Sequence, residues 1–179
     1  MYPDVFIPTS FEDFTIRDSL IKVPKCLVRF EKWEGVPVKN TFGGKAVVGL
    51  DGKPMFAEMA IAKTFIAAGW QARWIETYGK SNIQPICLSD WKDDTYKSQV
   101  HDAINDEKIL AMLAGIVAIN KGYSGCWDVL AWKGDKVLFA ESKRKGKDRM
   151  RDTQRGWLAA CLEYGMKEDD LLVVEWDMK

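Results

Sequence analysis

Three charged residues interrupt two apolar runs near the C-terminal end of the chain. Asp128 lies within CWDVLAW, and Glu141 and Lys143 lie within KVLFAESK. Apolar runs of this length are typical of buried strands, where a charged side chain is costly unless it has a partner. Their presence indicates a site at which carboxylates and a lysine carry out chemistry.

A tight turn between the two runs predicts that the three side chains meet. If Gly134-Asp135 is the two-residue turn of a hairpin, Asp128 lies directly opposite Glu141 on the neighbouring strand. Opposed side chains point to the same face, with Cβ atoms roughly 4.5–5.5 Å apart. Lys143 shares this face because it lies two residues after Glu141. A register shift of one residue would destroy the alignment.

Two carboxylates at this spacing favour a divalent cation. They repel each other and raise each other's pKa unless a cation lies between them. Two hard oxygen ligands with open positions suit Mg²⁺ or Mn²⁺. A lysine beside them can orient or deprotonate a water, or stabilise charge on a phosphate. The alternative is an ordinary ion pair at a strand edge, which E-x-K alone would not exclude.

Two helices supply further polar candidates. Glu58 lies on the face that a helix predicted over 56–69 buries, and a favourable interaction with the helix dipole is an equal alternative. Gln154 leans toward the core side of a later helix, with support of the helix cap as its alternative role. Glu76, at the end of a predicted strand, is a weaker acidic candidate.

The loop after Lys143 is the one strongly basic patch. From Lys143 to Arg155 the chain has seven Lys or Arg and two Asp residues. The loop leads into a helix N-terminus, which favours phosphate on its own account, so a phosphodiester substrate is expected. The residues assigned to substrate binding are Arg144, Lys145, Lys147, Arg149, Arg151 and Arg155.

The composition argues against several other chemistries. A single histidine, His101, excludes multi-histidine metal sites, and the four cysteines form no CxxC pair and are expected to be reduced core residues. Neither a GxSxG elbow nor a GxxxxGK[ST] phosphate loop is present. Formal net charge is zero, so nucleic acid must bind at a local patch. With neither a membrane-length apolar stretch nor a signal peptide, a cytoplasmic protein without membrane association is expected.

Turns and periodicity predict the elements that position these residues. With 179 residues, 47% of them hydrophobic, the chain suits a single domain over 1–179. Residues 1–53 form a β-rich N-terminal extension, with an Asp51-Gly52 hairpin and an earlier strand that Pro24 places at an edge or breaks. Residues 54–179 form the core, with an insertion at about 79–124 that carries its own helix.

Within the core, insertion aside, the predicted order is helix, strand, strand, strand, helix, strand. The two helices end at Gly69 and Gly165, where glycine suits the left-handed conformation of a helix end. Alternation of this kind predicts an α/β protein whose mixed sheet is covered by helices.

These residues resemble the PD-(D/E)xK nuclease superfamily and, within it, the VRR-NUC (virus-type replication-repair nuclease) group. The resemblance rests on GCWD ending at Asp128, on FAESK with Glu141 and Lys143, on a G-x-D loop, and on the helix that carries Gln154. It covers residues 122–160 closely and 54–179 loosely. Trp127 departs from the family pattern, which often has proline before the aspartate.

The resemblance implies a restriction-endonuclease-like αβββαβ core with Mg²⁺ or Mn²⁺ as cofactor. It implies that Asp128, Glu141 and Glu58 bind metal, with Lys143 and Gln154 as further catalytic residues. We therefore expect an endo- or exodeoxyribonuclease of replication, repair or defence that recognises ends, flaps or junctions. RNA as substrate and a homodimer remain open. The alternative is a catalytically inactive nuclease-fold module that binds nucleic acid or a protein partner.

Overall fold

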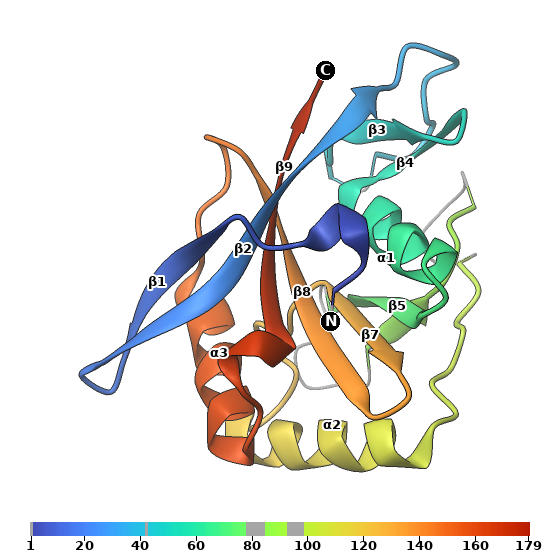
Figure 1. Cartoon of the computed structure of the whole chain (residues 1–179). Coiled ribbons are helices and arrows are strands. Elements are labelled where there is room, and N and C mark those ends of the chain that lie inside the picture. Colours follow the sequence, from blue (N-terminus) through green and yellow to red (C-terminus); the bar gives the residue numbers. More distant parts are fainter. Residues whose placement is uncertain (1, 42, 78–84, 93–98) are drawn as a thin grey trace.

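The chain folds around one mixed sheet that carries helices on both faces (Figure 1). The computed structural model describes residues 2–41, 43–77, 85–92 and 99–179. The strands in this part of the chain are β1 (Ser10–Ile16), β2 (Ser19–Lys32), β3 (Val47–Leu50), β4 (Lys53–Phe56), β5 (Gln71–Glu76), β6 (Ile86–Leu88), β7 (Val129–Lys133), β8 (Lys136–Arg144) and β9 (Leu171–Met178). The helices are α1 (Ala57–Ala67), α2 (Glu107–Asn120) and α3 (Asp152–Tyr164).

The strand order joins the N-terminal extension to the core in a single sheet. The order is β4-β3-β2-β9-β8-β7-β5-β6, and β1 pairs with β2 outside this path. β9 runs parallel to both of its neighbours, β2 and β8, whereas the remaining pairs are antiparallel. The predicted α/β class with a mixed sheet is confirmed, and the extension shares the sheet of the core because β2 pairs with the last strand.

Alternate strand side chains fill an apolar core on each face of the sheet. On one face α1 buries Ile61 and Phe65 completely. On the other face α2 buries Ile116 and α3 buries Trp157, whose ring centroid lies 5.7 Å from that of Phe139 on β8. Figure 1 shows α2 and α3 meeting at the bottom of the view, while the β1–β2 hairpin extends away to the left.

The hairpin turn predicted in the N-terminal extension is confirmed. Asp51 and Gly52 join β3 to β4 with φ angles of 51° and 71°, as a two-residue hairpin turn requires. β2 runs continuously through Pro24, so of the two predicted alternatives the break is wrong and the edge position is confirmed. The N–H of Thr9 donates to the carbonyl of Lys25, so Lys25 faces β1 and the nitrogen of Pro24 faces away from it. Pairing with β9 begins only at Lys25, which is why proline is tolerated in this position.

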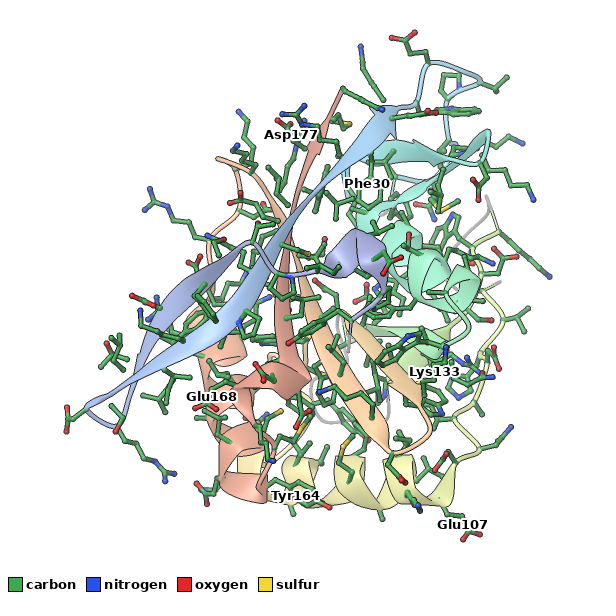
Figure 2. All side chains as sticks on the ribbon, viewed as in Figure 1. Phe30, Glu107, Lys133, Tyr164, Glu168 and Asp177 are labelled. Atoms are coloured by element: carbon green, nitrogen blue, oxygen red, sulfur yellow. The ribbon has the colours of Figure 1, made fainter. Side chains whose placement is uncertain are left out.

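The element order predicted for the core is confirmed as α1, β5, β7, β8, α3 and β9. Gly69 and Gly165 follow the ends of α1 and α3 with φ angles of 77° and 106°. Lys133, labelled in Figure 2, donates from Nζ to the carbonyl of Ala68 at 3.2 Å and so ties the β7–β8 turn to the end of α1.

The insertion contains the expected helix, α2, and one strand that the sequence does not predict. That strand, β6, pairs with β5 at the edge of the sheet. Asp106 caps α2, because its carboxylate accepts hydrogen bonds from the backbone N–H groups of Lys108 and Ile109. Tyr164 of α3, labelled in Figure 2, lies so close to Gly115 that a Cβ there would come within 2.2 Å of its ring. Residues 78–84 and 93–98 of the insertion lie outside the described residues.

The remaining sequence expectations concern cysteine, histidine and membrane spans. All four cysteines are buried and unpaired, as expected for reduced core residues. His101 is an exposed residue whose Nδ1 accepts a hydrogen bond from the backbone N–H of Cys87 at 3.0 Å. Throughout the described ranges, no helix has the length and apolar character needed to cross a membrane.

The packing of α2 predicts that the insertion stabilises the whole domain. Ile116 is fully buried, so Ile116→Ala should lower the free energy of unfolding by about 2–4 kcal/mol. The matched control is Leu110→Ala on the same helix, where the native side chain is 43% exposed and the change should stay within about 0.5 kcal/mol. Urea unfolding of both variants measures the difference, and equal effects would show that α2 is not part of the cooperative core.

Candidate functional site

The candidate residues meet at one end of the sheet. β5 and β8 both run antiparallel to β7, so their C-terminal ends lie at the end of the sheet where β7 begins. The first turns of α1 and α3 border the same end, and so does the loop that precedes β3. Together these segments surround a cavity of about 1010 Å³. Segments from several parts of the chain therefore contribute to one pocket.

The predicted hairpin register is confirmed by the pairs Lys133↔Lys136 and Val129↔Ala140. The first strand of this hairpin, β7, begins at Val129 rather than at residue 126 as predicted, so Asp128 lies one residue before the paired strand. Its Oδ2 accepts a hydrogen bond from the backbone N–H of Ser142 at 2.9 Å. That bond replaces the missing rung of the ladder and holds the aspartate against β8.

Glu141 is the most deeply buried member of the site, with 0% of its surface exposed. Its Oε1 accepts a hydrogen bond from Nζ of Lys143 at 2.7 Å and a second one from Nε2 of Gln154. Its Oε2 is also buried and accepts no hydrogen bond of normal geometry from the described part of the chain. A buried carboxylate oxygen without a donor is costly, which makes it a candidate ligand for a cation.

Gln154 links the two charged residues to α3. Its Oε1 accepts from Nζ of Lys143 at 3.1 Å and from the backbone N–H of Arg151 at 2.9 Å, so the amide can donate only toward Glu141. Gly125 allows this arrangement, because a Cβ at that position would lie 2.0 Å from the carbonyl oxygen of Thr153. Nε1 of Trp127 also donates to the carbonyl of Gln154, at 3.2 Å. The inward glutamine expected from the sequence is thus positioned by both its own helix and the segment before Asp128.

The electrostatics of the pair favour protonated or metal-bound carboxylates. Burial, followed by the charge of Glu58, raises the pKa of Asp128 from 3.8 to about 6, although Lys45 and Lys143 oppose the rise. Burial and the charge of Asp128 raise the pKa of Glu141 well above its usual value, against the opposing effect of Lys143. Negative charge on the two carboxylates is therefore disfavoured here, chiefly because they are buried.

Glu58 extends from the first turn of α1 toward the same cavity, with 14% of its side chain exposed. Its Oε1 accepts a hydrogen bond from Nζ of Lys45, a residue of the N-terminal extension. Glu76, at the end of β5, is buried and lines the cavity as well. Sequence reasoning identified the two glutamates but missed Lys45, because no local pattern shows where the loop before β3 lies.

The basic loop contributes four of its six candidate residues to the cavity. Those that line it are Arg144, Lys147, Arg149 and Arg151, whereas Lys145 and Arg155 are not among the lining residues. Oδ2 of Asp148 accepts from the backbone N–H of Arg144 at 2.9 Å, which closes the loop. The aspartate of the G-x-D pattern is therefore structural, and the loop cations form one wall of the pocket.

The donor set fits a cation with few protein ligands. Within the described residues, no group of three or more His, Cys, Asp or Glu side chains is arranged to hold a metal ion. Mg²⁺ commonly takes only one or two carboxylates and fills its other positions with water and substrate phosphate. Asp128 and Glu141 can supply those two carboxylates, and the unpaired Oε2 of Glu141 has the chemistry such a ligand needs.

Comparisons of the chain with models of protein families, with curated proteins and with solved structures found no match. The site is therefore interpreted from its own geometry and charge.

The raised pKa of Asp128 predicts a stability gain when its charge is removed. The folded-state pKa lies above the unfolded value, so this group stabilises the fold at low pH and that contribution is lost as pH rises from about 4 through about 6. In EDTA at pH 7, Asp128→Asn should raise the free energy of unfolding by about 1–2 kcal/mol. Thermal unfolding across this pH range measures the difference, which should shrink toward low pH. A variant less stable than the wild type at neutral pH would contradict the raised pKa of Asp128.

Proposed function

We propose that this protein is a metal-dependent nuclease that hydrolyses phosphodiester bonds in DNA. The observation that carries the proposal is the buried carboxylate of Glu141, which meets Lys143, Gln154 and Asp128 at the edge of a cavity with a basic wall. A protein that only bound nucleic acid would have no use for two neighbouring buried acids whose charged forms are disfavoured.

The element order supports the same proposal. We infer that α1, β5, β7, β8, α3 and β9 are the restriction-endonuclease-like αβββαβ core of a PD-(D/E)xK nuclease of the VRR-NUC group. The residues that carry this resemblance are Asp128, Glu141, Lys143 and Gln154. In this interpretation β1–β4 and the segment with β6 and α2 are additions to the core.

Each residue of the site has a chemical role in the proposed reaction. Asp128 and Glu141 would hold Mg²⁺ or Mn²⁺, which when bound lowers the pKa of a water molecule and neutralises charge on the phosphate. Lys143 donates hydrogen bonds to Glu141 and Gln154, so its ammonium is fixed beside the carboxylates where it can orient the attacking water and stabilise developing negative charge. Gln154 positions both side chains and keeps their geometry rigid.

The basic wall supports a nucleic-acid substrate. Arg144, Lys147, Arg149 and Arg151 line the cavity beside the acids, and the N-terminus of α3 lies with them. Formal net charge is zero, so the attraction for phosphate is local rather than spread over the surface. We therefore propose recognition of particular DNA structures such as ends, flaps or junctions. RNA as an additional substrate and a homodimer are further proposals.

One observation favours a second function, that of an inactive nuclease-fold module that binds nucleic acid or a protein. The described residues contain no cluster of three metal-ligating side chains, and Glu58 is paired with Lys45. Cleavage experiments separate this function from the first.

The nuclease proposal predicts that cleavage depends on both acids and on the lysine. Wild-type protein should cleave labelled DNA from a panel of single strands, nicks, flaps, junctions and supercoiled plasmid with Mg²⁺ or Mn²⁺, and not with EDTA. Glu141→Ala and Asp128→Ala should reduce cleavage by about 10³-fold or more, because each removes charge stabilisation at the reacting centre. Lys143→Ala should lose cleavage but retain metal binding, because lysine is not a ligand.

Two results would contradict this mechanism. One is cleavage that survives EDTA, and the other is activity that persists in Glu141→Ala. A wild type inactive on every DNA and RNA form would favour the binding module. Asp135→Ala is the matched control, because this acid lies in the hairpin turn with its side chain 95% exposed and should leave cleavage unchanged.

The position of the basic wall predicts which cations bind DNA. Replacing Lys147 and Arg149 with alanine should reduce the slope of log affinity against log salt by about 2, because two fewer counterions are released. Replacing Lys145 and Arg155 removes the same charge outside the cavity lining and should change the slope less. Fluorescence anisotropy in EDTA, over about 50–200 mM salt, measures both slopes. Equal slopes for the two double variants would place the DNA path outside the cavity.

A further inference from the structure

The loop between β2 and β3 brings a lysine of the N-terminal extension into the candidate site. The backbone N–H groups of Gly44 and Lys45 both donate to the carbonyl of Thr41, at 3.2 and 2.8 Å, and close a turn directly before β3. Gly43 and Gly44 have φ angles of 80° and 91°, a conformation that favours glycine. Gly43, Gly44 and Lys45 line the same cavity as the basic wall.

Lys45 is held in place by several partners. Its Nζ donates to Oε1 of Glu58 and lies 5.3 Å from the centroid of the Trp74 ring. Only 29% of its side chain is exposed. These contacts hold the ammonium inside the pocket.

Acids and lysines face one another in the pocket. Five acids line it, and Asp148 is the one that closes the basic loop. Lys45 and Lys143 interact with the other four, which are Glu58, Glu76, Asp128 and Glu141. Lys143 donates a hydrogen bond to Glu141, and Lys45 donates one to Glu58. Removal of Lys45 would leave Glu58 without its ion-pair partner and Asp128 with less positive charge near it, which is a favourable arrangement for a divalent ion.

We propose that Lys45 is a built-in counter-ion that competes with a divalent cation for Glu58. This inference rests on the proposed metal-dependent function and specifies how the metal site is limited. With the ammonium in place, Glu58 is occupied and Asp128 and Glu141 are the carboxylates left for the metal. When Glu58 joins a metal site, the ammonium of Lys45 must withdraw from it. The N-terminal extension is thereby coupled to metal occupancy.

Isothermal titration of Mn²⁺ into the full chain tests this competition. Lys45→Met keeps the apolar stem and removes the charge, so it should raise Mn²⁺ affinity about tenfold or more, because a fixed positive charge a few ångströms from a cation repels it strongly. Without metal the variant should melt at a lower temperature than the wild type, and Mn²⁺ should restore the loss. Lys45→Arg should keep the wild-type affinity because it keeps the charge.

Two controls attribute the effect to the pair of residues. Lys53→Met removes an exposed lysine of the same extension and should leave the affinity unchanged. Adding Glu58→Gln to Lys45→Met should cancel the gain, because the freed ligand is then gone. A gain that persists in this double variant would overturn the competition.

The outcome for Lys45 is separable from the outcome for the proposed function. If wild type and Lys45→Met bind Mn²⁺ equally, or if neither binds, Lys45 does not compete with metal. If only Lys45→Met binds, the competition stands and the proposed native metal site fails. If Lys45→Met loses cleavage with no gain in Mn²⁺ affinity, Lys45 serves the substrate instead, and the proposal is overturned while the nuclease function stands.

Discussion

The burial of one carboxylate, that of Glu141, constrains most of the architecture around it. Removing a carboxylate from water costs several kcal/mol unless charge and hydrogen bonds replace its hydration. Lys143 and Gln154 both supply such bonds to a residue with 0% exposure. Gln154 can do so only if α3 begins beside the end of β8, and Gly125 permits that approach because a side chain there would collide with Thr153. The positions of α3, of the β7–β8 hairpin and of the segment at Gly125 therefore all contribute to the hydrogen bonding of Glu141.

The strand order explains why the N-terminal extension belongs to the site. β9 lies between β2 and β8, so the extension is hydrogen-bonded into the sheet that carries the acids. From the end of β2 its loop returns toward α1 and places Lys45 against Glu58. Lysines from two segments therefore meet the acids of the pocket, Lys143 from the core and Lys45 from the extension. The wall of loop cations lies beside them and leaves phosphate a place near the carboxylates.

Local signals predicted much of the fold and of the site. Gly134-Asp135 determines the hairpin register, and from that register alone Asp128, Glu141 and Lys143 are expected on one face. Periodicity located α1, α2 and α3, because each buries a regular apolar stripe. The position of Lys45 could not be predicted, since it depends on a long loop and on pairing between β2 and β9. The short strand β6 was not predicted because it has too few residues to show a periodic pattern. Continuity of β2 at Pro24 could not be predicted either, because it depends on the proline nitrogen facing away from β1, one residue before pairing with β9 begins.

The central claim is that Asp128 and Glu141 share a divalent cation. Anomalous diffraction from crystals grown with Mn²⁺ tests it most directly, because the signal locates the metal independently of activity. We predict a strong anomalous peak within coordination distance of Oδ of Asp128 and Oε2 of Glu141, the oxygen that otherwise lacks a donor. An empty cavity at saturating Mn²⁺, or peaks confined to the outer surface of the protein, would contradict the account.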